Sequence, residues 1–498
     1  MDQASFGTLN ALVLVAYLLG VTVLALALAG RQRNTESYFL AGRSMPWLAV
    51  ALSTVASMLS GLTYLGAPAA AYKDNASLML AGPAALLATP LMIALYFPIY
   101  RRLKVTTIYE YVNARFGNRA RYAASALAVL QIQGWMGIAL FAPALALSTV
   151  TGIDLTRAIL LMGLVATAYT CTGGLAAVIW TDVIQFVILT TGAVVVAFSL
   201  VDRLPGGLDQ FFEIVLTADK LGVTDLRFDL AEATGLAVLL CYFISGFGYG
   251  NNQVVMQRLL AARSLREMTR ALLLDRVLEI LLAALLYMIG LGIFAYFLVY
   301  PEHLAPGVAG DRILPYYIVH ALPAGFSGLL IAAVFAAAMS TVDSGIHSSA
   351  TMIQVDFVTP LRKRALTQRQ SLMLARALTA GLGLLATAAA LLVSEGAGIL
   401  ETMSKVGGLT AAPVTGLFLL GVLTRRGHFP AWLAATVGIS LPLSIYVQNF
   451  VEMHWIFYTP VALLSCLCGS WLFSLLPRSR SSEDRDLEGL TIWDRRKG

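Results

Sequence analysis

The sequence is poor in charged residues, histidine and cysteine for its length. Charged residues make up 12% of its 498 positions and hydrophobic residues 58%, with five histidines and four cysteines. Soluble domains contain roughly 45–50% apolar residues, so this composition excludes a soluble globular protein. The cysteines all lie in apolar stretches and the histidines form no metal-binding motif, so we expect neither a disulfide framework nor a structural metal site.

What the sequence has in abundance is apolar segments of membrane-spanning length, about 20 residues. Such segments lie near residues 8–29, 46–72, 78–99, 122–149, 157–175, 179–201, 232–253, 273–299, 324–353, 373–393, 396–423, 429–449 and 456–476. We therefore predict an all-α integral membrane protein with about thirteen transmembrane helices. These helices form a single bundle over residues 1–477, followed by a cytoplasmic tail at residues 478–498.

Lysine and arginine are unevenly divided between the two sides of these predicted spans. With the N-terminus outside, 26 of the 34 Lys and Arg residues fall on the cytoplasmic side, as the positive-inside rule requires. This predicts a plasma-membrane protein, in a bacterium an inner-membrane protein, with a cytoplasmic C-terminus. The bias also accounts for the net charge of +6 without a nucleic-acid partner. We interpret Arg258 and the basic run 362–364 as cytoplasmic anchors, and the outer loop 202–231 as a linker rather than a lid.

Two predicted spans are interrupted by small and polar residues. The span 46–72 contains Ser60-Gly61 and Pro68, and the span 236–253 ends in the sequence SGFGYGNN at 245–252. Lipid cannot hydrogen-bond a loose backbone, so irregular chain at membrane depth persists only where it lines a protected cavity. A pair of such breaks in corresponding halves of a chain points to the binding site of a transporter. We expect a solute cavity between the breaks, lined by Ser60, Thr63, Trp135, Ser245 and Tyr249.

The span 324–353 carries an unusual number of polar side chains. Ala337, Ser340, Thr341 and Ser344 share one helical face, because they are three or four residues apart. Small polar residues in a span often have no role beyond letting two helices pack closely, and we interpret Ser348 and Ser349 in this way. An ionisable residue within a span, here Asp343, is a functional candidate by default. For the polar face we favour binding of a hard monovalent cation, which requires oxygen ligands.

Several motifs follow one another in a fixed order along the chain. They are ASMLSGLTYLGAP at 56–68, TIYEY at 107–111, FAPA at 141–144, GGLAAVIWTD at 173–182, NQVVMQR at 252–258 and MST at 339–341. In order and spacing, these motifs resemble the sodium/solute symporter family over roughly residues 37–426. The resemblance implies a core of five-plus-five inverted repeats, about 46–201 and 232–423, in which each repeat begins with a broken helix.

The resemblance also implies a sodium ion as the coupling ion and names its ligands. The main sodium site would use the carbonyls of Ala56, Leu59 and Ala337 and the hydroxyls of Ser340 and Thr341. A break in a helix frees carbonyls for this purpose, since they lose their partners four residues ahead. The expected function is sodium-coupled import of a small organic solute by alternating access.

Some members of the family bind a second sodium ion, and the matching positions here include Asp182, Asp343 and Ser344. Three interpretations of Asp343 stay open: a ligand of that ion, a partner of Lys405 across the bundle, or a protonated acid. Lys405 could instead pair with Glu401, one turn earlier. Asp182 could instead cap the start of a helix.

The substrate is predicted from the same resemblance. Residues 56–68 are most similar to the iodide, monocarboxylate and vitamin branch, so we expect a small carboxylate or another small anion. At the position of the arginine of sialic-acid carriers this chain has Trp135, and the amide or acid of sugar carriers aligns with Thr63 and near Gly82. Both differences disfavour these substrates, so a sugar or sialic-acid-type carrier is the alternative rather than the first choice. A solute sensor that does not transport is the rival from another class. The expected partners are the solute, sodium and the lipid bilayer. We expect no enzyme activity and no obligate protein partner.

Overall fold

The computed structural model describes residues 7–29, 34–323, 325–393, 399–476 and 487–494, and these ranges are almost entirely helical. The helices are α1 (Thr8–Ala29), α2 (Thr35–Leu40), α3 (Trp47–Met58), α4 (Gly61–Lys73), α5 (Ala81–Leu103), α6 (Tyr109–Phe116), α7 (Asn118–Thr151), α8 (Leu155–Asp202), α9 (Gly207–Thr217), α10 (Gly235–Gly246), α11 (Gln253–Leu260), α12 (Leu265–Val299), α13 (Ile313–Ala321), α14 (Phe326–Met352), α15 (Thr359–Leu361), α16 (Gln368–Ala390), α17 (Ile399–Leu423), α18 (Phe429–Ala435), α19 (Leu441–Phe450) and α20 (Tyr458–Phe473). The predicted all-α class is confirmed.

Many of these helices have the length and composition of membrane spans. Within the described ranges, nine helical segments meet both criteria, and the bent pair of α3 and α4 makes ten. Three shorter apolar segments, Thr8–Leu24, Leu155–Ala168 and Gly235–Asn251, also fall on predicted spans. These findings agree with a multi-pass membrane protein. The total of thirteen spans and the inverted repeat stay predictions.

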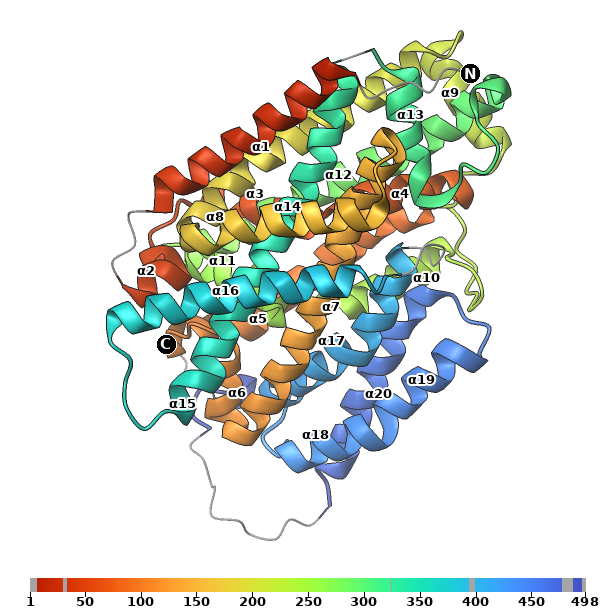
Figure 1. Ribbon diagram of the computed structural model, residues 1–498. Coiled ribbons are helices and arrows are strands. Elements are labelled where there is room, and N and C mark those ends of the chain that lie inside the picture. Colours follow the sequence, from red (N-terminus) through yellow and green to blue (C-terminus); the bar gives the residue numbers. More distant parts are fainter. Residues whose placement is uncertain (1–6, 30–33, 324, 394–398, 477–486, 495–498) are drawn as a thin grey trace.

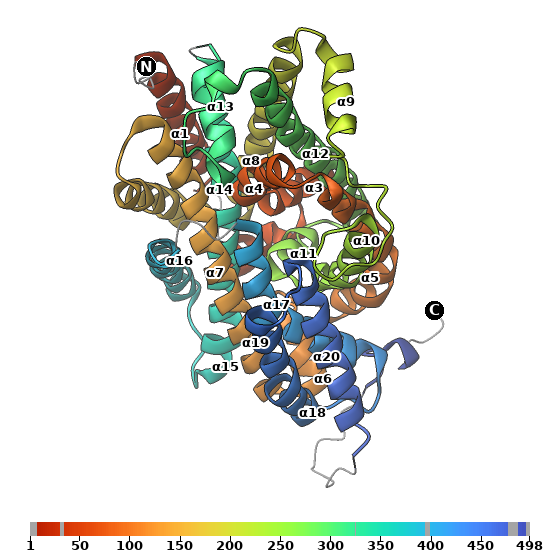
Figure 2. The ribbon, with the colours of Figure 1, turned by 90° about the vertical axis from the view of Figure 1, so that its right-hand side faces the viewer.

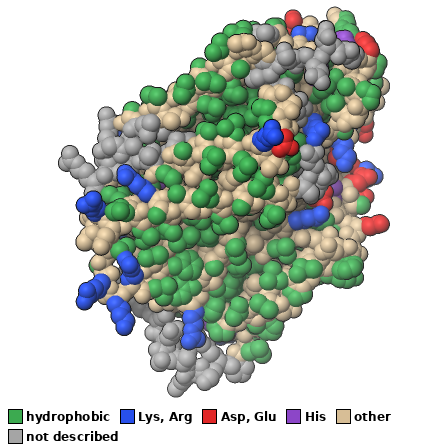
Figure 3. All heavy atoms as spheres, viewed as in Figure 1, with side chains coloured by type: hydrophobic (Ala, Val, Ile, Leu, Met, Phe, Trp, Pro, Cys, Tyr) green, Lys and Arg blue, Asp and Glu red, His purple; other side chains and the backbone are tan. Residues whose placement is uncertain are grey.

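Helix α14 runs through the middle of the bundle and packs against α1, α3, α4, α7, α8 and α16. Almost all of its side chains are buried. Figures 1 and 2 show α1 and α8 on one side of the molecule and α17 to α20 on the other. In Figure 3, one end of the bundle carries basic side chains without acidic ones, whereas the acidic side chains lie toward the other end among further basic ones, with a broad hydrophobic surface between the two ends. We call these the basic end and the acidic end.

The predicted spans 157–175 and 179–201 follow each other directly within α8, which is broken at Gly174 (φ 58°, ψ 178°). The apolar segments Leu155–Ala168 and Gly173–Asp202 fall on these two predicted spans. Only glycine adopts this backbone conformation without strain, so the direction of the chain changes there without a loop. The outer segment 202–231, interpreted as a linker, contains the helix α9.

The first predicted break is confirmed between α3 and α4, whose axes differ by 54°. Helix α3 ends at Met58, and Ser60 is extended (φ −71°, ψ 170°) before α4 begins at Gly61. A Cβ atom on Gly61 would lie 3.0 Å from the Cβ of Ala338. The small residues at the break therefore let α14 approach the interrupted backbone closely.

The second predicted break lies between α10 and α11. Helix α10 passes into a 3-10 turn, Phe247–Asn251, and α11 begins after Asn252, whose side chain accepts a hydrogen bond from the amide of Val254 (2.9 Å). The carbonyl of Gly250 accepts a hydrogen bond from the hydroxyl of Tyr100 (2.9 Å). A side chain thus satisfies backbone that is released from the helix, as burial in a membrane requires.

Gly250 should be intolerant of even one added methyl group. A Cβ at this position would lie 2.2 Å from the ring of Tyr96 and 2.7 Å from the side chain of Met92. We expect Gly250→Ala to lower the free energy of unfolding by about 1–3 kcal/mol, the usual cost of overpacking. Gly381→Ala is the matched control, because nothing lies within 4 Å of its Cβ position. Thermal unfolding of the detergent-solubilised variants measures both, and equal melting temperatures would contradict the tight packing.

Candidate functional site

The polar face of α14 meets the first break through two hydroxyl groups. Ser340 Oγ donates to the carbonyl of Ala56 (2.7 Å), and Thr341 Oγ1 donates to the carbonyl of Ser57 (2.9 Å). The same hydroxyls lie 3.0 and 3.3 Å from the carbonyl oxygen of Ala337, one turn earlier on α14. Both hydroxyl residues are buried. The structure therefore brings four of the five predicted sodium ligands together.

The carbonyls at this site are available because α3 ends there. The last backbone hydrogen bond of α3 runs from the amide of Leu59 to the carbonyl of Val55 (2.8 Å). Later carbonyls lie beyond the helical ladder, where side chains or ligands must satisfy them. Leu59, the fifth predicted ligand, is buried at the bend. Its carbonyl contributes no hydrogen bond to α14, so its place in the site rests on the resemblance alone.

Arg258 is buried at the centre of the bundle, so its interpretation as a cytoplasmic anchor is wrong. Its side chain is 0% exposed and forms an ion pair with Asp182 of α8 (2.9 Å). It also donates to Ser53 Oγ of α3 (2.9 Å) and contacts the hydroxyl of Ser344. A buried guanidinium needs such partners, because an unpaired charge in a low-dielectric interior is very costly. This arginine links α11, the second half of the second broken helix, to α3, α8 and α14.

Two of the three residues predicted for a second sodium ion, Asp182 and Ser344, contact this arginine. Asp182 is fully buried in the middle of α8, so it does not cap a helix start. Its Oδ2 accepts hydrogen bonds from Ser53 (2.6 Å) and Arg258, whereas its buried Oδ1 has no hydrogen-bond partner among the described residues. Asp343 is also 0% exposed, next to Ser344 on α14.

Lys405 does not pair with Asp343. It forms an ion pair with Glu401 one turn earlier on α17 (2.7 Å), and both side chains are more than a third exposed. The pair of Lys405 with Glu401, which was the alternative interpretation from the sequence, is therefore the one that forms. Of the three interpretations of Asp343, the cation ligand and the protonated acid remain.

The five predicted substrate residues are not gathered around one cavity. Ser60 is buried at the first break and Trp135 is buried on α7, and Ser60 Oγ and Trp135 Nε1 have no hydrogen-bond partner among the described residues. Thr63 and Ser245 are partly buried on α4 and α10. Tyr249 turns toward α12: its hydroxyl donates to Asp275 (3.3 Å), and the guanidinium carbon of Arg276 lies 3.5 Å from the centre of its ring.

A charged cluster on α12 was missed in the sequence analysis. Asp275 and Arg276 lie inside a span that hydropathy alone identifies, and both are less than 5% exposed. Arg276 also pairs with Glu279 (2.6 Å). Charged residues within spans are functional candidates by default. That rule could have singled out Asp275 and Arg276, but their contact with the second break required the structure.

A cavity of about 1040 Å³ opens at the acidic end of the bundle. Gly66 and Ala69 of α4, Phe141 and Leu145 of α7, and Leu400 of α17 form part of its wall. None of the five predicted substrate residues lines it, but Thr63 lies one helical turn before Gly66. The cavity therefore reaches to within about a turn of the first break.

Comparison with known proteins gives full-length matches. The model of the sodium:solute symporter family matches residues 38–434. The sodium/sialic acid symporter NanT of Aliivibrio fischeri is 30% identical over 97% of this chain and 96% of its own length. The sodium/sialic acid symporter SiaT of Proteus mirabilis is 31% identical over 93% of this chain and 94% of its own length. The sodium-coupled monocarboxylate transporter 2 of Danio rerio is 31% identical over 84% of this chain and 69% of its own.

Solved structures agree with these sequence matches. The substrate-bound, outward-open structure of a Na⁺-coupled sialic acid symporter matches with a TM-score of 0.88 and 29% identity, covering 94% of this chain and 98% of that chain. The nucleobase-cation symporter MHP1, at 14% identity and a TM-score of 0.53, shares the fold. The chain therefore belongs to the sodium:solute symporter family, as its motifs predicted.

Proposed function

We propose that this protein is a symporter that uses the sodium gradient to import a carboxylated sugar of the sialic-acid type by alternating access. Its two sialic acid symporter relatives match along at least 93% of this chain and 94% of their own lengths. The monocarboxylate transporter matches over only 69% of its own length. This reverses the order expected from sequence, in which a small carboxylate came first and a sialic-acid-type solute second.

The carboxylate of the substrate could bind at the first break, although this chain has Trp135 where sialic-acid carriers have an arginine. The N-terminus of α4 has no side-chain cap from Ser60, so its first backbone amides are available to an anion. Ser60 Oγ is buried and without a hydrogen-bond partner among the described residues. Trp135 of α7, at the position where the resemblance expects an arginine, carries a buried indole N–H that also has no hydrogen-bond partner among the described residues. We infer that this chain recognises its anion with amides and hydroxyls.

We propose that the first sodium ion binds at Ala56, Leu59, Ala337, Ser340 and Thr341. The carbonyls and hydroxyls that meet there are hard, neutral oxygen donors, and each hydroxyl retains lone pairs for a cation while it donates its proton. An ion at this point bridges α14 and the bent helix, so its binding free energy biases the bundle between two conformations. An inward-moving charge gains about 2.3 kcal/mol per 100 mV of membrane potential.

We propose a second cation near Asp182, Asp343 and Ser344. These residues belong to one fully buried polar cluster, because Ser344 Oγ lies 3.4 Å from Asp343 Oδ1 and contacts Arg258, which pairs with Asp182. Asp182 Oδ1, which lacks a hydrogen-bond partner among the described residues, is the available ligand atom.

The acidic end is placed outside the cell and the basic end in the cytoplasm. Six carboxylates, from Asp74, Asp219, Asp225, Glu232, Asp311 and Glu401, line the mouth of the cavity, against three basic residues, Lys73, Arg227 and Arg312. Burial lowers the pKa of His454, so this histidine adds no charge there at neutral pH. Hydrogen bonds from Arg227 lower the pKa of Asp225, which is therefore ionised. A net negative mouth raises the local concentration of sodium ions.

Uptake into proteoliposomes tests the proposed function directly. With an inward sodium gradient, we expect the reconstituted protein to accumulate labelled sialic acid above its equilibrium level, because downhill sodium entry supplies the free energy. Equal sodium on both sides should abolish the accumulation. Sodium-driven uptake of pyruvate that sialic acid does not inhibit would reassign the substrate to the monocarboxylates. Binding of solute without any sodium-driven uptake would indicate a sensor.

Ser340→Ala should weaken sodium activation specifically. Loss of one oxygen ligand worth about 1.4 kcal/mol would raise the sodium concentration for half-maximal uptake about tenfold. Ser348→Ala is the matched control, because Ser348 is equally buried on α14 but lies two turns from the break. Sodium titrations of initial uptake rates compare the two. An equal effect of both substitutions would place the ion elsewhere.

Asp343→Asn should remove the second cation and leave the ion pair of Arg258 intact. We expect the Hill coefficient for sodium to fall toward 1, because a neutral amide no longer balances a second positive charge. Asp182 is the poorer choice for this test, since removing one partner of a buried ion pair costs about 3–5 kcal/mol of stability. Sodium dependence of uptake, measured together with thermal stability, separates the two effects. An unchanged cooperative curve would eliminate the second site.

A further inference from the structure

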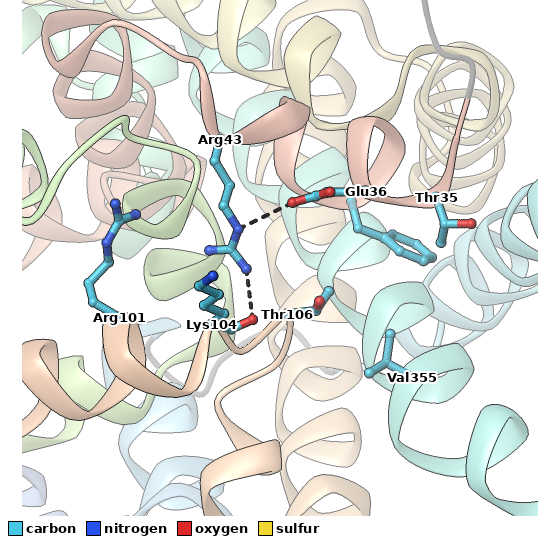
Figure 4. A pocket seen from close by; sticks show the side chains of 8 residues that line it. Thr35, Glu36, Arg43, Arg101, Lys104, Thr106 and Val355 are labelled. Atoms are coloured by element: carbon cyan, nitrogen blue, oxygen red, sulfur yellow. Dashed lines mark hydrogen bonds and ion pairs between the residues drawn. The ribbon is translucent and has the colours of Figure 1, made fainter. Parts of the chain in front are cut away.

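A second cavity, of about 540 Å³, lies at the basic end of the bundle, apart from both breaks. Three basic side chains, Arg43, Arg101 and Lys104, and one acidic side chain, Glu36, line it, together with Thr35, Phe39, Thr106 and Val355. Figure 4 shows the three basic residues on one side of the cavity and Thr35 and Val355 on the other. The lining carries a net charge of +2, from three cations and one carboxylate.

The two arginines are fixed in place by neutral groups, so their charges persist. Arg43 donates to the carbonyls of Lys104 and Val105 (both 2.9 Å). Arg101 donates to the carbonyls of Ala262 (3.2 Å) and Arg263 (2.9 Å). These carbonyls orient the guanidinium groups without cancelling their charge.

The only acid in the lining compensates these cations weakly. Glu36 Oε1 lies 3.4 Å from Arg43 Nε, and its side chain is 62% exposed. Exposed pairs of this kind contribute little, with a median near 0–1 kcal/mol. The two guanidinium groups therefore remain an ordered, positively charged wall.

Lys104 adds a flexible donor to this rigid wall. Its backbone is held at the end of α5 (φ 49°), where its amide bonds to the carbonyls of Arg101 and Tyr100. Its side chain is exposed, and its ammonium group forms no hydrogen bond or ion pair with any residue in the described ranges. A lysine in this position has three N–H donors to offer a ligand.

We propose that this cavity binds a phosphate-type anion at the cytoplasmic surface, with Arg43 and Arg101 as a preoriented wall and Lys104 as the residue that closes on the anion. Arginine and lysine are the preferred partners of phosphate oxygens, and basic pockets on the cytoplasmic side of membrane proteins bind anionic headgroups. The chemistry is shared by a phospholipid headgroup and by free phosphate. The bound anion would join the turn before the first broken helix to the loop after α5.

Thermal unfolding of the full-length protein in detergent tests this site. The protein is titrated with phosphatidylglycerol in mixed micelles, with phosphatidylcholine as the zwitterionic lipid, and with sodium phosphate against sodium chloride at constant sodium and ionic strength. We expect phosphatidylglycerol or phosphate to raise the melting temperature of the wild type. Lys104→Gln should raise the apparent Kd for that ligand about tenfold, and Lys104→Glu should abolish the shift.

Arg102→Gln is the matched control. Arg102 neighbours the same helix end, but its guanidinium donates to the carbonyl of Glu488 (2.8 Å) and does not line the cavity. A shift with phosphatidylglycerol alone identifies a lipid headgroup, and a shift with phosphate identifies a free anion; both support the site. The proposal is overturned if neither ligand shifts the wild type, if phosphatidylcholine shifts it equally, or if Lys104→Gln and Arg102→Gln weaken the shift to the same extent.

Discussion

The structure depends on hydrogen bonds to the backbone carbonyls that are left without helical partners where two helices are broken inside the bundle. At the first break, hydroxyls of Ser340 and Thr341 bond to the carbonyls of Ala56 and Ser57. At the second, the hydroxyl of Tyr100 bonds to the carbonyl of Gly250. A typical hydrogen bond of this kind contributes only about 0.5–1.5 kcal/mol net, although an unsatisfied buried group costs more. Such contacts therefore hold the break when no ion is present and can yield to a cation that offers a stronger interaction.

Arg258 links the two broken helices to each other. It lies on α11, the second half of the second broken helix, and bonds to Ser53 on α3, the first half of the first. At the basic end, the amide of Met45 also bonds to the carbonyl of Ala261 (3.0 Å), and Arg263 donates to the carbonyl of Ser44 (3.1 Å). The two half-helices are therefore joined both through their side chains and through the turns at their ends.

The two ends of the bundle offer opposite electrostatic environments. Among the charged residues that line the cavity at the acidic end, carboxylates outnumber basic groups, and this cavity approaches the first break. The charged residues of the cavity at the basic end are mostly basic, and it lies beside the turn that leads into the first broken helix. The first environment favours cations and the second favours anions.

The sequence by itself determined the membrane class, the places of both breaks and the polar face of α14, because each follows from local composition or from helical spacing. It did not reveal that Arg258 is buried, because its partners Asp182 and Ser53 lie 76 and 205 residues away. Nor could it show that Tyr249 faces Asp275 and Arg276, or that two predicted spans follow each other without a loop at Gly174. Hydropathy records how apolar a segment is, but the partner of a charged or polar group is decided only when distant helices pack together.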